Sequence, residues 1–159
     1  MSNSVRGARF WIGAWLPVLL GMAVIALEST DLFGADHTDG PLRRLYEAIF
    51  GFVTNGSWED IHHYIRKSGH FVGYGLIALS FLRAWWKVLP QTRFVLDAFL
   101  ALVGTALIAS ADEFHQSFLP NRTGTPADVL LDCCGAITLQ LLVYVFMRIA
   151  KPKRLARMA

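Results

Sequence analysis

The segment Ser110-Ala-Asp-Glu-Phe-His-Gln-Ser-Phe-Leu-Pro-Asn-Arg-Thr-Gly-Thr-Pro-Ala-Asp-Val-Leu-Leu-Asp132 decides how this chain is interpreted, because it sets polar groups between two strongly apolar runs. It holds four carboxylates together with a histidine, a glutamine and an arginine. The flanking runs, residues 94–111 and 129–147, contain one acid each. An ionisable group in the hydrocarbon region of a membrane costs about 2.5 to 3.5 kcal/mol on insertion scales, so this cluster indicates a site.

The composition favours a membrane protein, since 54% of the 159 residues are hydrophobic and only 17% are charged. Two further apolar runs cover residues 10–27 and 71–89, and a helix that crosses a membrane needs roughly 20 mostly apolar residues. The sequence therefore predicts an all-α polytopic membrane protein with a single domain, residues 1–159. The domain is expected to be a bundle of four transmembrane helices, with spans near residues 10–30, 69–89, 94–114 and 127–149.

A cleaved signal peptide is the alternative interpretation of the first run, because Arg6 and Arg9 precede it and Val24-Ile-Ala26 resembles a cleavage site. The run has 18 uncharged residues, whereas the apolar region of a signal peptide has about 7 to 15. Trp11 and Trp15 also fit the interface end of an anchored helix. We therefore interpret the run as a retained span.

The orientation follows from the basic residues, which collect in the cytoplasmic loops of membrane proteins. With both termini cytoplasmic, ten of the fifteen lysines and arginines lie inside and eleven of the twelve acids lie outside. The net charge of +3 is then a consequence of topology. It gives no reason to expect a nucleic-acid partner.

Helical spacing gathers polar residues at the outer ends of the second, third and fourth spans. Residues three, four or seven positions apart share a helix face. One such stripe, on the second span, consists of Lys67, His70 and Tyr74. The third span carries Asp112, His115 and Gln116, with Glu113 paired to Gln116, and the fourth carries Asp128, Asp132 and Gly135. Gly135 is expected to let a neighbouring helix approach just below the acids.

Each stripe also has a structural interpretation. Thr125-Pro-Ala-Asp128 matches a capping box, in which Asp128 reaches back to a free amide. Asp112 and Glu113 fit a helix end in water, and His70 fits a hydrogen-bonded packing residue. Asp132 lies a turn deeper in the apolar run, so a partner among His70, Lys67 and Arg122 is expected.

Two sequence blocks resemble the VanZ-like family. Lys67-Ser-Gly-His70-Phe-Val-Gly-Tyr74 is similar to its K-x-x-H-F-x-x-Y signature. The second block runs from Asp112-Glu-x-His115-Gln-x-Phe118-x-Pro120-x-Arg122 to Asp128-Val-Leu and Gly135. Two positions depart from the family pattern: Asn121 replaces a glycine, and Asp132 replaces an asparagine.

The resemblance implies a multi-pass protein of the bacterial cell (inner) membrane. The family is named for an accessory protein of low-level resistance to teicoplanin, a lipoglycopeptide that binds peptidoglycan precursors outside the cell. The resemblance therefore implies a location in the bacterial cell membrane and a link to antibiotic resistance, but it implies no chemical reaction.

The residues themselves favour an anionic ligand, because Arg122 presents a fork of donors suited to phosphate and Lys67 adds a point charge. A membrane lipid or a lipid-linked cell-wall precursor offers phosphate, hydroxyls and tails together. The predicted ligand-binding set is Lys67, His70, Tyr74, Asp112, Glu113, Gln116, Arg122, Asp128 and Asp132.

Three alternatives stay open. Ser68-Gly-His70 resembles the S-G-H block of phosphatidic-acid-type lipid phosphatases, with His70, Glu113 and Asp112 as candidate catalytic residues, although the family's second histidine after the arginine is absent. No cofactor is expected; the second alternative is a divalent cation held by Asp112, His115, Asp128 and Asp132. The third alternative is a buried polar network that only stabilises the bundle. The oligomeric state does not follow from the sequence.

The outer segment between the first two spans is expected to contain two short helices. Residues 41–53 place apolar side chains on one face, and Ser57-Trp-Glu-Asp60 matches a capping box for a helix through Ile65 that continues into the second span. His62 and His63 are interpreted as a solvated or interfacial pair whose side chains point about 100° apart.

Overall fold

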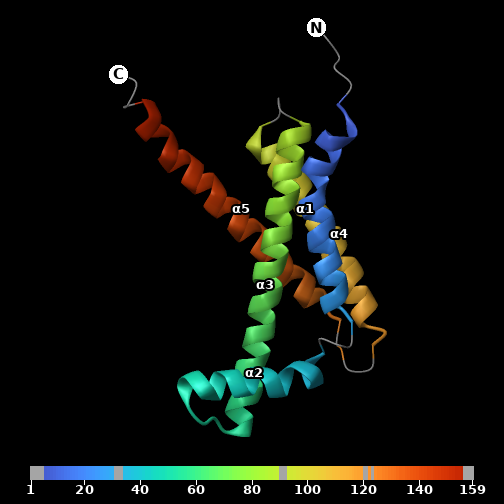
Figure 1. Ribbon diagram of the computed structural model, residues 1–159, viewed down its shortest axis with the longest axis vertical. Coiled ribbons are helices and arrows are strands. Elements are labelled where there is room, and N and C mark those ends of the chain that lie inside the picture. The colour runs from blue at the N-terminus through green and yellow to red at the C-terminus, as the bar shows by residue number, and fades with distance from the viewer. Residues whose placement is uncertain (1–5, 31–33, 90–92, 120–121, 123, 156–159) are drawn as a thin grey trace.

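The computed structural model describes residues 6–30, 34–89, 93–119, 122 and 124–155, apart from the side chains of Asp36 and of residues 151–155. These residues form five α-helices and no strand: α1 (Ala8–Glu28), α2 (Ala35–Phe50), α3 (Asn55–Val88), α4 (Phe94–Gln116) and α5 (Pro126–Leu155). The start of α1 and the end of α5 lie at one end of the molecule, and α2 lies at the other (Figure 1).

Three of the described helices, α1, α4 and α5, are long and apolar enough to cross a membrane. Many of their large apolar side chains face outward, as Leu19, Leu107 and Phe146 do at 59%, 68% and 71% exposure. Such surfaces suit lipid contact. The expected span at residues 69–89 forms the second half of α3. This half also carries His70, Arg83 and Lys87, which lower its hydropathy, so four crossings remain an expectation.

Helix α3 is the central element of the fold. It packs against all four other helices, and α5 crosses it obliquely while α1 and α4 lie along its other side (Figure 1). Its Tyr74 and Ile77 join Ile25 of α1 and Ala109 of α4 in the buried core. The polar residues of α3 are consequently surrounded by neighbouring helices on several sides.

The crossing of α3 and α5 is a direct contact between backbones. A methyl group added at Gly135 would overlap the carbonyl of Phe71, and one added at Gly75 would lie 2.6 Å from Leu139 Cδ1. The close approach expected at Gly135 is therefore confirmed. Because His70 immediately precedes Phe71, the contact also sets the register between α3 and the acids of α5.

A polar contact joins the first half of α1 to the last turns of α3. Pro17 lies inside α1 and has no N–H, so the carbonyl of Gly13 loses its usual donor four residues on. Arg83 Nη1 donates to this carbonyl at 3.0 Å, and Lys87 Nζ lies 3.5 Å from it. The arginine thus satisfies a backbone group that the proline leaves open.

The segment between α1 and the expected second span differs from the sequence expectation at two helix starts. Helix α2 begins at Ala35 and ends at Phe50, before Gly51 at φ +88°, so Pro41 lies within the helix and does not begin it. Helix α3 begins at Asn55 with Thr54 as its cap, and the Thr54 hydroxyl accepts from the amide of Ser57 at 3.4 Å. The N-cap is therefore Thr54, and Ser57 donates its amide hydrogen to it.

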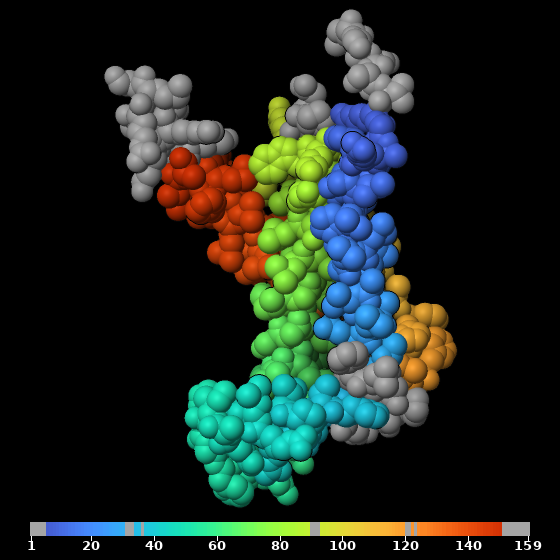
Figure 2. Space-filling model, in the orientation of Figure 1, coloured from blue at the N-terminus to red at the C-terminus, as the bar shows by residue number. Residues whose placement is uncertain are grey.

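Helix α3 then continues without a break through Gly69 to Val88. Helix α2 lies across its first turns and forms the foot of the molecule (Figure 2). This arrangement leaves the middle of α3 open toward the connection between α4 and α5.

Candidate functional site

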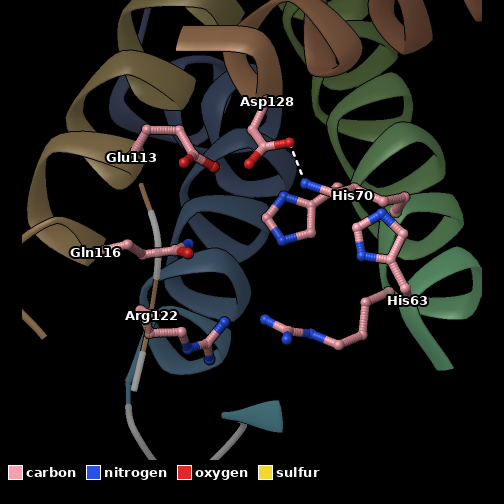
Figure 3. Close-up of a pocket in the computed structure, with 8 residues that line it drawn as sticks. His63, His70, Glu113, Gln116, Arg122 and Asp128 are labelled. Carbon is pink, nitrogen blue, oxygen red and sulfur yellow. Dashed lines mark hydrogen bonds and ion pairs between the residues drawn. The ribbon is translucent and has the colours of Figure 1, made fainter. Parts of the chain in front are cut away.

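A polar pocket of about 120 Å³ lies where the middle of α3 faces the end of α4 and the start of α5. This volume is enough for several water molecules or one phosphate group. Side chains from both sides point into the same space (Figure 3). We define the polar pocket by its lining residues His63, Arg66, Lys67, His70, Glu113, Gln116, Arg122 and Asp128.

His70 links the polar pocket to the acids beneath it. Its Nδ1 lies 3.6 Å from Oδ1 of Asp132, and its ring stacks on Tyr74 at 6.0 Å between centroids. Asp132 is fully buried, whereas the His70 side chain is 25% exposed. The expected partner of Asp132 is therefore His70, and the imidazole separates the buried acid from the pocket.

Asp112 lies below the pocket with one oxygen occupied and one open. The Tyr74 hydroxyl donates to Asp112 Oδ2 at 2.8 Å, and Gln116 Nε2 donates to the same oxygen at 3.0 Å. Asp112 Oδ1 is buried without a hydrogen-bond partner among the described residues. Both donors fix the orientation of the carboxylate.

Glu113 and Asp128 organise the start of α5. The amide of Thr125 donates to Glu113 Oε2 at 2.9 Å, and the Thr125 hydroxyl donates to Asp128 Oδ2 at 3.1 Å. The Asp128 amide lies 3.3 Å from that hydroxyl, as an N-cap requires. The predicted cap is present, but Glu113 takes the amide that Asp128 was expected to reach.

Asp128 has a second partner across the pocket, because Lys67 Nζ pairs with its Oδ1. The Asp128 side chain is 13% exposed and that of Lys67 is 34% exposed. The pair ties α3 to the first turn of α5 at the rim of the polar pocket.

Arg122 lines the pocket and also closes the end of α1. Its Nη2 donates to the carbonyl of Glu28 at 2.6 Å and to that of Thr30 at 2.9 Å. Carbonyls at the end of a helix lack intrahelical donors, so the arginine satisfies them. Part of the Arg122 guanidinium, which was expected to bind an anion, thus donates to backbone carbonyls instead.

The structure places the predicted residues at two levels. Lys67, His70, Glu113, Gln116, Arg122 and Asp128 line the pocket, while Tyr74, Asp112 and Asp132 lie beneath it. Asn121 lies outside the described residues. The grouping expected from helical spacing is therefore present in space.

His115 is the exception, because its Nδ1 lies 2.8 Å from the hydroxyl of Ser29 on the α1 side. The expected cation ligands Asp112, His115, Asp128 and Asp132 do not form one group. Among the described residues, the acids and histidine whose ligand atoms lie within 4.8 Å of one another are His70, Asp112 and Glu113. Asp112 and His115 share a helix face, but Asp112 meets Tyr74 of α3 whereas His115 meets Ser29 at the end of α1.

Two lining residues were not anticipated, Arg66 and His63. Arg66 precedes His70 by four positions and His63 precedes it by seven, so both fall on the face already identified by spacing. His62, taken for half of a solvated pair, is instead buried at 6% exposure. It lies 3.1 Å from the Thr38 hydroxyl of α2.

An apolar groove adjoins the polar pocket between α1 and α3. We call it the lateral groove; its volume is about 470 Å³. It shares Arg66, His70 and Arg122 with the polar pocket. Its remaining lining residues are mostly apolar: Gly21, Val24, Ile25, Glu28, Thr38, Gly69, Gly73, Leu76 and Ile77. Polar and apolar spaces therefore meet at the same three side chains.

Comparison with protein families gives a match that covers most of the chain. The family model described as VanZ/LLP1 matches residues 14–148. Comparisons with curated proteins and with solved structures gave no match. The matched range includes every residue of the polar pocket and of the lateral groove.

Proposed function

The chain belongs to the VanZ/LLP1 family, and from this premise we propose that the protein binds an anionic membrane lipid or lipid-linked cell-wall precursor. The phosphate-bearing headgroup occupies the polar pocket, and the tail lies in the lateral groove. The observation that carries the proposal is the continuity of the two spaces through Arg66, His70 and Arg122. A ligand with a charged head and an apolar tail fits such a junction.

The charges of the polar pocket support this choice of headgroup. Arg66, Lys67 and Arg122 contribute three cationic side chains, against the acids Glu113 and Asp128. Lys67 is paired with Asp128, so Arg66 is the cation best suited to meet an anion. The amide of Gln116 adds a neutral group for hydroxyls.

The membrane topology forms part of the proposal. In it, α1, the second half of α3, α4 and α5 cross the bacterial inner membrane, with both termini in the cytoplasm. This orientation follows the distribution of basic residues. The polar pocket then opens at the outer face, where lipid-linked precursors of the cell wall are exposed. A link to glycopeptide resistance of the teicoplanin type is proposed on the same basis.

Lipid retention tests the proposal through the lateral groove. Gly73 lines the groove, and a Cβ added there meets nothing within 4 Å, so Gly73→Leu places a large apolar side chain in the groove from a position with room for its Cβ. We expect native mass spectrometry of the purified protein to show at least tenfold less co-purified lipid in this variant. Equal retention in Gly73→Leu and in the wild type would contradict the proposal.

A matched control uses the same substitution elsewhere on α3. Gly56 is also free of neighbours within 4 Å and lies in the first turn of the helix, outside the groove. Gly56→Leu is expected to retain lipid as the wild type does. On the pocket side, Arg66→Gln is expected to weaken retention of lipids with phosphate headgroups, whereas Arg43→Gln in α2 is not.

Hydrolysis of a lipid phosphate is a second candidate, favoured by one observation. His70 faces the pocket while its Nδ1 lies 3.6 Å from a buried carboxylate, and a carboxylate in that position orients an imidazole for proton transfer or attack. Phosphate release from lipid phosphates by the same preparation distinguishes catalysis from binding. Release that is equal in the wild type and in His70→Gln would exclude this role.

A further inference from the structure

Three potential ligands from two helices converge at the inner end of the polar pocket, two in its lining and one beneath it. His70 comes from α3, and Asp112 and Glu113 come from the last turns of α4. One ring nitrogen and one oxygen from each acid all lie within 4.8 Å of one another. The two acids are only 8% and 5% exposed, so bulk water does little to separate their charges.

The hydrogen bonds of these acids come from neutral groups. Asp112 accepts from a tyrosine hydroxyl and a glutamine amide, and Glu113 accepts from the backbone amide of Thr125. Neutral donors orient carboxylates, but they compensate two adjacent negative charges poorly in a weakly hydrated site. A positive charge between them would compensate both acids, and either a protonated His70 or a bound cation can supply it.

An independent observation shows where such a charge would lie. Asp112 Oδ1 is buried without a hydrogen-bond partner among the described residues, although Oδ2 of the same carboxylate has two. A buried polar atom is rarely left without a partner in a folded protein. A cavity of about 20 Å³, room for one water-sized species, is lined by Asp112 together with His70, Tyr74, Gln116 and Glu28. Glu113 lines the polar pocket, which shares His70 and Gln116 with this cavity.

Each of the three side chains is also held by a second residue. Asp132 lies beside Nδ1 of His70, Tyr74 fixes Asp112, and the Thr125 amide fixes Glu113. The negative charge of Asp132, 3.6 Å from Nδ1, favours the tautomer that carries its proton on Nδ1 and leaves the lone pair of the imidazole on Nε2. Metal-binding histidines are commonly oriented in this way by a carboxylate on the other ring nitrogen.

The geometry points to a divalent cation bound by His70, Asp112 and Glu113. One imidazole and two carboxylates suit a first-row ion such as Mn²⁺ or Zn²⁺. An ion held by these three ligands would keep coordination positions for water or for an anionic oxygen, and the polar pocket that His70 and Glu113 line could supply either. This inference goes beyond the proposed lipid site and does not rest on it.

Binding of manganese to tag-free protein tests the inference. The protein is treated with a chelator, exchanged into a micelle of uncharged detergent without phospholipid, and titrated with MnCl₂ while electron paramagnetic resonance measures free Mn²⁺. We expect one equivalent to bind. Asp112→Asn and Glu113→Gln, which preserve side-chain size, are each expected to weaken binding at least a hundredfold.

The controls separate this site from the other acidic and histidine residues. His115→Gln tests the set suggested by spacing alone and is expected to leave manganese affinity within about threefold of the wild type, as is Asp60→Asn on the exposed part of α3. If the wild type binds no manganese at millimolar concentration, or if Asp112→Asn and Glu113→Gln bind as the wild type does, the inference is wrong. Because phospholipid is absent, failure here leaves the lipid proposal standing.

Discussion

Two histidines of α3 have closely similar surroundings. His62 and His70 each place Nδ1 3.6 Å from an aspartate oxygen, Asp39 for the first and Asp132 for the second. Each ring also stacks on an aromatic side chain one turn away, at 5.5 Å on Trp58 for His62 and at 6.0 Å on Tyr74 for His70. A histidine, an acid and an aromatic ring therefore occur twice on one helix.

The two histidine–acid pairs differ in which member is the more buried. At the foot of the molecule the His62 side chain is 8% exposed and Asp39 is 46% exposed, whereas in the site His70 is 25% exposed and Asp132 is fully buried. Nε2 of His62 meets the Thr38 hydroxyl, and none of the described residues bonds Nε2 of His70. The comparison teaches that a histidine–acid pair serves a structural role when both ring nitrogens of the histidine contact protein groups. The pair is available for a ligand when one ring nitrogen lacks such a contact.

The largest expected effect is the loss of manganese affinity when His70 is replaced. His70→Gln removes the imidazole ligand, so we expect manganese affinity to fall at least a hundredfold, which corresponds to about 2.7 kcal/mol. The apparent melting temperature in detergent should change little, because the ring has few polar contacts to lose. A large fall in stability with unchanged manganese binding would instead favour the purely structural network.

The next effect concerns the buried acid. Asp132→Asn keeps the size of the side chain but removes the charge beside Nδ1 of His70, so manganese affinity is expected to fall about tenfold to a hundredfold. Stability should not fall, because a buried carboxylate is costly to keep. Asp39→Asn, the equivalent change at the foot, is expected to leave manganese binding unchanged; titration of both variants checks the difference.

The converse change is His62→Gln. This substitution removes the ring that stacks on Trp58 and contacts Thr38 and Asp39. The Thr38 hydroxyl then loses its histidine partner, so the free energy of unfolding should fall by about 1 to 2 kcal/mol. Manganese and lipid binding should match the wild type. Chemical unfolding in mixed micelles measures the first quantity, and an accompanying loss of binding would show that the foot and the site are coupled.

The smallest effect is expected at Thr38. Thr38→Val preserves shape and removes the hydroxyl that lies 3.1 Å from His62, which should lower the unfolding free energy by about 1 kcal/mol. The comparison would need revision if this variant were less stable than His62→Gln.

The sequence was most informative where the relevant distance runs along one helix. Spacing alone grouped Lys67 with His70, and the missing side chain at Gly135 indicated that α5 approaches a neighbouring helix closely, which the structure shows to be α3. Thr125 and Asp128 were also recognisable, because a helix cap is a local arrangement. In each case the chain itself fixes the geometry.

The sequence was less informative where a distant segment supplies the partner. The burial of His62 depends on α2 folding back across α3, which no local pattern specifies. Arg122 meets carbonyls of α1 that lie more than ninety residues away, and His115 turns to Ser29 for a similar reason. Pro41 was taken for the start of α2, although its helix has already begun at Ala35.

The contact between Gly135 and Phe71 has a mechanical consequence. If α5 tilts as a rigid rod about this contact, each of its residues moves in proportion to its distance from Gly135. At 1.5 Å per residue, Asp132 lies only about 4.5 Å along the axis and Ala150 about 22 Å. In such a tilt the far end of α5 would move roughly five times as far as the acid beside His70, so the geometry around the imidazole would be nearly constant.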